Sequence, residues 1–427
     1  MKSIAKTPKR SKKTKQLGPA QVLRPDQYEA FDVETKVECI RALIPLGLMH
    51  VQALLEAEVC TLAGARYARK ASQFPGRRHG SNPGSVRLAG QQVPLRIPRV
   101  RQADGEEEIP LATLPTFREQ GFLDDVLLKR VLYGISCRNY EAAAAAVPGA
   151  IGLSSSTVSR AFTQASAKQL QELQDRDLSE LDLVAVFLDG KTFADMTMVI
   201  AVGITLTGEK HILGFVETGT ENEQVLTPFL QGLCERGLNG SQGLLVIIDG
   251  GKGLRAAVRH AFGSAAVVQR CQWHKRENVV KHLPQSEQAT WRTRLQRAYE
   301  RPTYAEARAA LHRLHRDLET RNQSAARSLT EGLEETLTLH RLGVFALLGL
   351  SFKTTNCLES INAAVEERCA KVDRWTHSNQ RQRWLATALL DIEPRLRRVK
   401  GYRHLPKLRE ALRRDLNIAQ TVTKNVA

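Results

Sequence analysis

The sequence predicts an α/β protein with a buried central sheet and a large share of helix. Two continuous apolar runs, residues 184–188 and 244–248, are typical of strands that are buried on both faces. Each run is followed at once by an aspartate, Asp189 and Asp249 respectively. The core fixes the backbone of such a residue while its side chain faces the rim of the sheet, where open α/β sheets bind ligands.

Residues 183–283 are expected to contain most of the sheet. Three strands joined by short turns come first, and strand–helix alternation follows. That order is typical of a ribonuclease-H-like sheet, whereas a Rossmann domain alternates from its first strand. The Gly-rich residues 250–253 lack the spacing of a nucleotide-binding P-loop. The expected elements are strands at 184–189, 197–205, 210–217, 243–249 and 265–270, and helices at 223–236 and 253–262.

Helical composition extends over residues 27–70, 117–175 and 285–350. Between the first two stretches the chain turns to Gly, Pro and Arg. Residues 74–84 have the punctuation of a loop, and residues 86–101 alternate like a short hairpin. Its arginines suit either phosphate binding or a solvated surface; they are Arg87, Arg96, Arg99 and Arg101.

Net charge points to a polyanionic partner. The chain carries 62 Lys+Arg against 45 Asp+Glu, a formal charge of +17, which favours nucleic acid over the alternative of a merely basic enzyme. No apolar stretch approaches the roughly 20 residues of a membrane span. Residues 1–16 hold seven Lys/Arg without an apolar region after them, so they do not read as a secretory signal. Seven scattered cysteines suit a reduced, cytoplasmic protein, and binding to nucleic acid would make it nucleoid-associated.

A helix-turn-helix is expected within residues 133–162. Residues 142–147 form a small-residue helix, 148–152 a break, and Ser154 or Ser155 an N-cap for the next helix. Short polar side chains at the start of such a helix can reach base edges in the major groove, although any two helices with a tight turn look similar. The candidates are Ser155, Thr157, Ser159 and Arg160.

Glu359 joins Asp189 and Asp249 as a third candidate acid, within TTNCLESIN at 354–362. Two strand-end aspartates and a glutamate from a helix could hold a pair of Mg²⁺ or Mn²⁺ ions for phosphoryl transfer. Simpler roles exist for each. Asp249 could form a turn or cap a helix, and Asn356 with Glu359 has the spacing of a capping box.

Further candidates surround these acids. Cys271 and His274 have the spacing of half a zinc site, but no second pair follows at finger spacing, so a packed cysteine and a hydrogen-bonded histidine are favoured. The Arg-, Lys- and His-rich stretch around them is expected where DNA passes, which selects Arg270, Lys275 and Arg276. Trp375 and Arg383 could stack on an unpaired base, or Trp375 and Trp384 could anchor a helix on the sheet.

Taken together, these motifs resemble the Mutator-like class of DDE transposases of bacterial insertion sequences. The resemblance spans about residues 65–400, and its most specific part runs from Asp249 to Asn278. It is carried by YARKASQFPGRRHG, VPLRIPRVR, GISCRNYE, GLSSSTVSR, FLDGK, VIIDGGKGLRAAV, VQRCQWHKREN, TTNCLESINA and the RW pairs at 374–375 and 383–384.

The resemblance implies a ribonuclease-H-like core with an all-helical insertion before the last acid. It places the catalytic and metal-binding triad on Asp189, Asp249 and Glu359, and the family's C-x-x-H motif on Cys271 and His274. It also implies two Mg²⁺ or Mn²⁺ ions. Its partners would be DNA, as terminal inverted repeats and target, and a second copy of the chain in a homodimer or larger oligomer.

The expected organisation follows from these assignments. A DNA-binding regulator or domesticated relic without catalysis, and a nuclease that cuts without joining, remain as alternatives. The segments are a disordered basic arm (1–20), an N-terminal helical region with a small basic β unit (21–115), a helix-turn-helix DNA-binding region (116–180), the first part of the catalytic core (181–284), an all-helical insertion (285–350), the final core helices (351–400) and a basic C-terminal tail (401–427).

Overall fold

The structure is a computed structural model, and its described residues fall into two compact units. The first unit lies within residues 50–117 and the second within residues 123–418. The expected basic arm and the first helix of the expected helix-turn-helix lie outside the described residues. Those described are 50–67, 73–88, 91–117, 123–134, 155–193, 196–219, 222–370, 372, 374–375 and 379–418.

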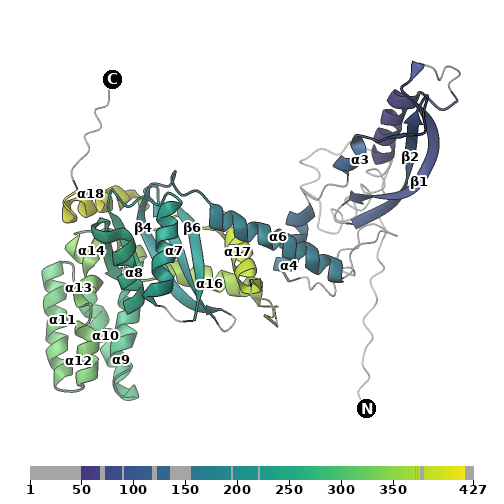
Figure 1. Ribbon diagram of the computed structural model, residues 1–427. Coiled ribbons are helices and arrows are strands. Elements are labelled where there is room, and N and C mark those ends of the chain that lie inside the picture. Colours follow the sequence, from purple (N-terminus) through teal and green to yellow (C-terminus); the bar gives the residue numbers. More distant parts are fainter. Residues whose placement is uncertain are drawn as a thin grey trace, which may run out of the picture. The chain divides into compact units, whose positions relative to one another are not determined.

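The first unit is a helix packed on a β ribbon (Figure 1). The helix covers residues 50–63. The ribbon consists of β1 (Gly76–Leu88), β2 (Gln91–Gln102) and the short β3 (Glu108–Ile109), all antiparallel, and α3 (Thr113–Thr116) follows. Apolar residues one or two turns apart on the helix pack on alternate ribbon residues, which makes a small separate core. This core includes Val51, Leu55, Val59, Val86, Val93 and Val100.

The loop expected at residues 74–84 is wrong, because β1 starts at Gly76 and pairs along its length with β2. The register shifts between Arg78 and Ser81, and Gly80 lies there with φ +75°. At a β-bulge of this kind, glycine can adopt the positive φ that the backbone requires, and the strand bends but continues. Turn-forming residues therefore mark a kink inside a long strand here, and not its boundary.

The second unit is built on a five-stranded mixed sheet with the order β6-β5-β4-β7-β8. β4 (Leu183–Phe193), β5 (Met196–Thr205) and β6 (Lys210–Thr218) are antiparallel, and β7 (Leu244–Ile248) and β8 (Ala266–Arg270) continue the sheet parallel to β4. All five expected strands are present within a few residues of their expected limits. The fold class α/β is confirmed.

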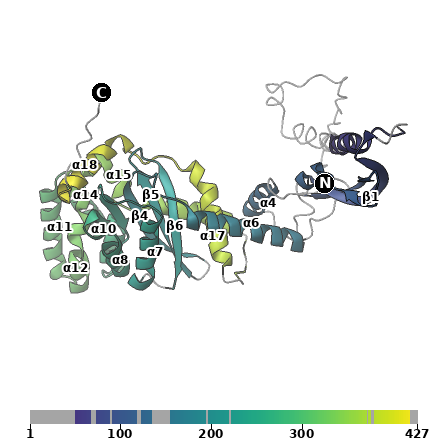
Figure 2. The same ribbon diagram turned by 45° about the horizontal axis from the view of Figure 1, so that its top comes forward.

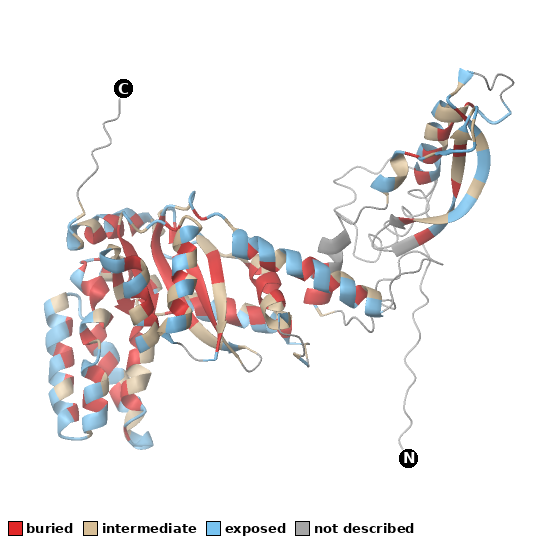
Figure 3. Cartoon of the chain, viewed as in Figure 1, coloured by how far each residue is buried: buried red, intermediate tan, exposed pale blue. Residues whose placement is uncertain are grey.

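Helices cover both faces of this sheet, and the strands between them are buried along most of their length (Figure 3). On one face α7 (Glu223–Glu235) and α8 (Lys252–Phe262) pack on Val186 and Leu188. On the other face Phe187 packs beneath α15 (Phe345–Phe352), α16 (Asn356–Cys369), α17 (Gln380–Ile392) and α18 (Leu405–Asp415). The alternation of Val186, Phe187 and Leu188 between the two cores is the period of two of a β-strand.

Helices α10 to α14 form a separate helical layer, in which α10, α11 and α12 lie side by side in both views (Figures 1 and 2), and α10 and α12 contact α9. The helical character expected for residues 285–350 is confirmed. The layer has its own hydrophobic cluster, which includes Trp291, Leu295, Leu311 and Leu318. The bounds are α9 (Gln272–Val280), α10 (Gln285–Tyr299), α11 (Tyr304–Glu319), α12 (Gln323–Thr330), α13 (Leu333–Thr336) and α14 (Thr338–Arg341).

Two helices of the expected helix-turn-helix region belong to the second unit, α4 (Leu123–Leu132) and α6 (Ser155–Asp175). They contact each other, and α6 also contacts α17. The buried face of α6 carries Val158, Phe162 and Leu170. Among the helices of the described residues, none is long and apolar enough to cross a membrane.

Candidate active site

Asp189 and Asp249 lie at neighbouring positions of two adjacent strands. Leu188 of β4 is the register partner of Ile248 of β7, and the two strands are parallel. Asp189 directly follows Leu188, and Asp249 directly follows Ile248. The two aspartates are therefore at the same position along two neighbouring strands, which lie roughly 5 Å apart. Asp189 is buried, with 7% of its surface exposed, and Asp249 is half-buried.

Both aspartates are directed to the face of the sheet that α16 covers. Phe187 and Ile247 belong to the core beneath α16, and each precedes its aspartate by two residues. Side chains two residues apart point to the same side of a strand. Asp189 therefore lies on the face of β4 that α16 contacts, and Asp249 directly follows the strand β7 beside it.

Glu359 is exposed in the first turn of α16 and belongs to the helix face that meets β4. Lys191 of β4 forms an ion pair with Glu366 of α16 at 2.6 Å. Lys191 lies two residues beyond Asp189 on the same side of the strand, and Glu366 lies two helical turns beyond Glu359 on the same side of the helix. The side of α16 that carries Glu359 thus faces the side of β4 that carries Asp189.

The start of α16 is tied to the sheet edge by a short series of hydrogen bonds. The amide of Cys271 donates to the carbonyl of Ile248 at 2.7 Å, and the amide of Gln272 donates to the carbonyl of Lys353 at 2.9 Å. The buried hydroxyl of Thr355 lies 3.8 Å from Cys271 Sγ and 3.5 Å from His274 Nδ1. These bonds position the first turn of α16, and with it Glu359, beside the end of β7.

The capping box considered for Asn356 and Glu359 is wrong. Asn356 is already the first helical residue, Thr355 occupies the N-cap position, and no side-chain hydrogen bond caps the helix. The carboxylate of Glu359 is therefore not used to complete a cap at Asn356.

The turn after β7 fixes Asp249. Its Oδ1 accepts a hydrogen bond from the amide of Gly251 at 2.9 Å. Gly250 has φ +116°, and a Cβ added to it would lie 2.0 Å from Nε of Arg270. Arg270 Nη2 donates to the carbonyl of Gly250 at 2.8 Å. The turn-forming role expected as the alternative for Asp249 is present, and it leaves the second carboxylate oxygen for other contacts.

Arg270 and Lys275, which the sequence suggested as DNA contacts, lie inside the protein. Both donate to the carbonyl of Glu331 in the helical layer. Lys275 is 1% exposed, and burial, with Arg270 nearby, lowers its pKa to about 8. Arg383 is likewise buried and donates to the hydroxyl of Ser166 at 2.8 Å. Contact of these three cations with DNA would require them to leave these partners.

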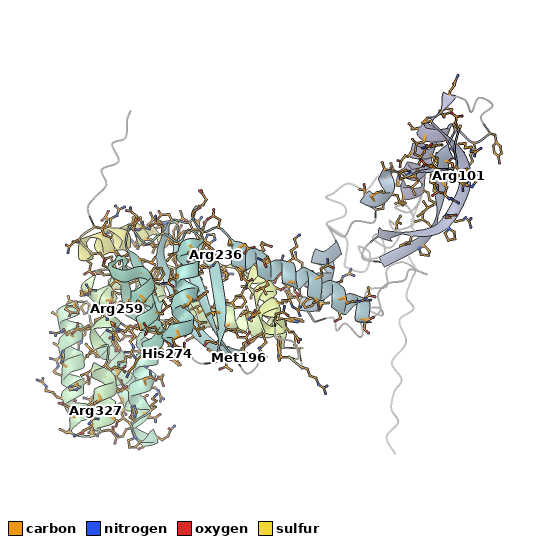
Figure 4. The ribbon with its side chains drawn as sticks, viewed as in Figure 1. Arg101, Met196, Arg236, Arg259, His274 and Arg327 are labelled. Carbon is orange, nitrogen blue, oxygen red and sulfur yellow. The ribbon has the colours of Figure 1, made fainter. Side chains whose placement is uncertain are left out.

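Cys271 is buried, and burial raises the pKa of its thiol. Figure 4 shows His274 at the same end of the sheet as Met196, the first residue of β5. His274 is half-buried and packs edge-to-face on Trp273 with ring centroids 4.8 Å apart. The pair therefore connects α9 to Thr355, which matches the packed cysteine and hydrogen-bonded histidine favoured by the sequence.

The other suggested DNA contacts are distributed over several elements. Ser155, Ser159 and Arg160 are exposed in the first turns of α6, and Thr157 is half-buried. Trp375 packs on Phe193 and Trp384 with ring centroids 5.1 and 6.4 Å apart. This is the anchoring role that the sequence offered as an alternative to base stacking. Arg276 is half-buried and donates to Gln296 at 3.2 Å.

The donor set at the sheet edge suits a hard divalent cation. Mg²⁺ keeps several waters and takes one or two protein carboxylates together with substrate phosphates, and Mn²⁺ prefers similar oxygen ligands. Asp189 and Asp249 supply that number of donors from adjacent strands. Within the described residues, no group of three His, Cys, Asp or Glu side chains stands ready to hold a metal ion. A third ligand would have to come from a movement of Glu359 or from substrate.

Several features of this site do not stand out in the sequence. Arg270 affects the site by donating a hydrogen bond to the carbonyl of Gly250. Thr355 affects it by contacting Cys271 and His274. The one available signal for the first is the glycine directly after Asp249, because a strand-end acid followed by glycine indicates a turn with positive φ. The ion pair of Lys191 with Glu366 joins residues far apart in the chain, so no local pattern reveals it.

The chain is similar over most of its length to a known class of proteins. The family model described as "Transposase, Mutator family" matches residues 23–396, and the chain belongs to this family. It is 27% identical over 315 residues to the transposase for insertion sequence element IS256 in transposon Tn4001 of Staphylococcus aureus, covering 70% of this chain and 76% of that protein.

Two further relatives extend the match. The transposase for insertion sequence element ISRM5 of Rhizobium meliloti is 26% identical over 379 residues, covering 86% of this chain and 92% of that protein. The transposase for insertion sequence element IS6120 of Mycolicibacterium smegmatis is 27% identical over 293 residues, covering 67% of this chain and 88% of that protein. The family resemblance inferred from the sequence motifs is confirmed.

Proposed function

We propose that this protein is an insertion-sequence transposase that binds the terminal inverted repeats of its element and cuts and joins DNA strands. The observation that carries the proposal is the register of β4 and β7, which brings Asp189 and Asp249 together at one edge of the sheet. The strand order β6-β5-β4-β7-β8 supports a ribonuclease-H-like core, with residues 285–350 as its helical insertion.

The proposed reaction has two steps at phosphorus. Water attacks a phosphodiester at the element end, the bond from phosphorus to the 3′ oxygen breaks, and a 3′ hydroxyl and a 5′ phosphate result. That 3′ hydroxyl then attacks a phosphodiester of the target strand and displaces the target's own 3′ oxygen, which leaves as a 3′ hydroxyl. Two Mg²⁺ or Mn²⁺ ions, when bound, would lower the pKa of the attacking hydroxyl or water and neutralise charge on the leaving oxygen. Asp189, Asp249 and Glu359 would hold them. No protein nucleophile is needed, because the phosphoryl group passes directly between oxygens.

The residues of this chain would contribute rigidity. Asp189 is fixed by the ladder of β4, and Asp249 by the amide of Gly251 and by Arg270 beneath the turn. Glu359 stands exposed at the start of a helix that is anchored at both the Thr355 and the Glu366 positions. The fixed carboxylates of Asp189 and Asp249 would require little reorganisation when charge develops in the transition state, and the exposed Glu359 would reach the ions by a side-chain movement.

DNA recognition is proposed for the exposed start of α6, where Ser155, Ser159 and Arg160 are accessible. A helix presented in this way suits the major groove. Transposition holds two element ends together, so we propose that the active form is a homodimer or a larger assembly of this chain.

The test is a strand-transfer assay with the full-length protein and labelled duplexes that carry the element ends read from the flanking DNA. With Mg²⁺ or Mn²⁺, wild-type protein should give cut and joined products, and EDTA should remove both. Asp189→Asn, Asp249→Asn and Glu359→Gln should each abolish the products while leaving DNA binding intact. Cleavage that persists in Asp249→Asn contradicts the proposal.

A matched control is available on the same helix as Glu359. Glu367 is also exposed on α16. It lies one residue beyond Glu366, the partner of Lys191, and eight residues beyond Glu359, so its side chain leaves the helix on a different side from Glu359 and Glu366. Glu367→Gln removes the same charge and should retain cleavage. Sequence-specific binding without any cut strand, indifferent to metal, would instead identify a regulator. Cut strands without joined product would identify a nuclease.

A further inference from the structure

A groove lined with arginines runs between α10 and α11 on the helical layer. It encloses about 480 Å³, and its charged lining consists of Arg294, Arg297, Arg301, Arg313, Arg316 and Asp317. Residues 294, 297 and 301 are three and four positions apart on α10 and just after it, and residues 316 and 317 lie three and four positions after residue 313 on α11. Such spacings place each set on one helix face.

Four of these arginines have no partner within the described part of the chain. Arg297, Arg301, Arg313 and Arg316 are exposed, and none of their side chains forms an ion pair or hydrogen bond there. Arg294 is different, because it pairs with Asp317 and stacks 4.2 Å from the centre of the Trp291 ring. Arg294 thus consumes the single acid of the groove, and four positive charges remain uncompensated.

Other arginines of the same layer are paired. Arg292 pairs with Glu277 at 2.9 Å, Arg308 with Glu334 at 2.7 Å and Arg321 with Glu287 at 3.1 Å. The first unit also has an arginine-lined hollow, but Arg78 there pairs with Glu56 at 2.7 Å, and Arg96 donates to Ser81 at 2.9 Å. Like charges gathered without partners destabilise a surface unless an anion joins them.

We propose that this groove is a binding surface for the sugar-phosphate backbone of duplex DNA, distinct from the carboxylate site. The seven steps from residue 294 to residue 301 span roughly 10 Å at 1.5 Å per residue. That length matches about three successive phosphates of one strand, at 3.4 Å of rise each. One small anion cannot meet four guanidinium groups spread over two helices, whereas a backbone can. Guanidinium groups also bind phosphate oxygens in pairs, with little sequence preference.

This inference rests on the proposed function only in taking DNA as the polyanion. Its test measures the affinity of full-length protein for a 30-bp duplex of arbitrary sequence, by fluorescence anisotropy over a series of NaCl concentrations. The test variant is Arg297→Gln, Arg313→Gln and Arg316→Gln combined. The control combines Arg292→Gln, Arg308→Gln and Arg321→Gln, which removes the same three charges from the same layer but from paired residues.

We expect the slope of log K against log salt to become shallower by up to about 2.7 in the test variant, since each lost phosphate contact removes about 0.9. The control should change the slope by less than one contact. The corresponding Arg→Lys triple should recover most of the slope, because the charge is kept. Equal slopes in the test variant, the control and the wild type overturn the proposal, as does an equal loss in both triples.

Two further measurements separate the remaining outcomes. A test variant that keeps the wild-type slope but changes oligomeric state in light scattering would assign the groove to an acidic surface of a second copy, and would overturn the DNA assignment. Failure of the proposed function has a different signature. In that case wild-type protein yields no metal-dependent cut strand while the groove variant still loses its salt slope.

Discussion

At the scale of single residues, the site depends on side chains that act on the backbone of others. Gly250 and Arg270 illustrate this, because the guanidinium group occupies the space that a Cβ at position 250 would need. Asp249 is held in place from below by this contact and from the side by the amide of Gly251. The position of the Asp249 carboxylate is thus set by Gly250 and by the buried guanidinium group of Arg270.

Gly250→Ala should therefore impair both stability and cleavage. Positive φ at a residue with a side chain costs about 1–3 kcal/mol, and the displaced Arg270 adds to this. We expect a lower melting temperature and strand cleavage reduced by at least about tenfold, because a factor of ten needs only about 1.4 kcal/mol. Gly263→Ala is the control, since Gly263 also has positive φ, +55°, but open space around its Cβ position. Equal cleavage by the two variants would contradict this account.

Lys275 predicts a pH dependence of stability. Its pKa is lowered to about 8 from the ordinary 10.5, chiefly by burial. Between these values the unfolded chain binds a proton that the folded chain has released, so stability rises with pH from about 8 towards 10.5. Lys275→Met lacks this contribution. In thermal unfolding from pH 7 to pH 10, the wild type should gain on the variant above about pH 8. A difference that stays constant with pH would refute the shift.

At the scale of elements, much of the sheet could be predicted from the sequence. The apolar runs before Asp189 and Asp249 are buried on both faces, and such strands have a strong and simple pattern. The N-cap of α11 also follows a local sequence pattern, a threonine three residues before a glutamate. In the structure Thr303 Oγ1 accepts a hydrogen bond from the amide of Glu306 at 3.3 Å. The loop expected at 74–84 failed because glycine and proline signal a bulge inside a strand as strongly as they signal its end.

What the sequence could not supply is pairing between distant elements. The side of α16 that faces β4 is set by Lys191 and Glu366, and the burial of Arg270 and Lys275 follows from the carbonyl of Glu331. A cluster of basic residues in a sequence says nothing about which of them meet solvent. Composition alone therefore favoured Lys275 as a DNA contact, and left Arg297 and Arg313 unremarked.

Helix caps of the helical layer give a prediction at this scale. Asn322 accepts from the amide of Ala325 at 2.9 Å and donates to the carbonyl of His282 at 2.8 Å. Within the described part of the chain, the side chain of Thr303 makes a single hydrogen bond, which it accepts from the amide of Glu306. Loss of a cap costs about 1 kcal/mol, so Asn322→Ala should lower the denaturation midpoint more than Thr303→Ala does. Neither variant should change DNA cleavage per folded molecule.

At the scale of the whole molecule, the formal charge of +17 makes DNA affinity strongly dependent on salt. A protein with six to ten phosphate contacts loses about 10³ to 10⁵ in affinity between 50 and 200 mM salt. We expect a loss in this range for duplex of arbitrary sequence, measured by anisotropy. A decrease smaller than tenfold would show that the excess charge is spread over surfaces that DNA does not reach.

The hydrogen bonds to the carbonyl of Glu331 limit how independent the helical layer is from the rest of the protein. With a hydrophobic cluster of its own, the layer from α10 to α14 resembles a module that could be deleted or exchanged. Arg270 and Lys275, beside the edge that carries the two aspartates, nevertheless donate hydrogen bonds to it. Removing the layer would take from Lys275 the carbonyl to which it donates, and from Arg270 one of two acceptors, since the carbonyl of Gly250 remains. A replacement layer would have to supply a hydrogen-bond acceptor at the position of the Glu331 carbonyl. Exchange of this layer between relatives by recombination is therefore constrained at Glu331.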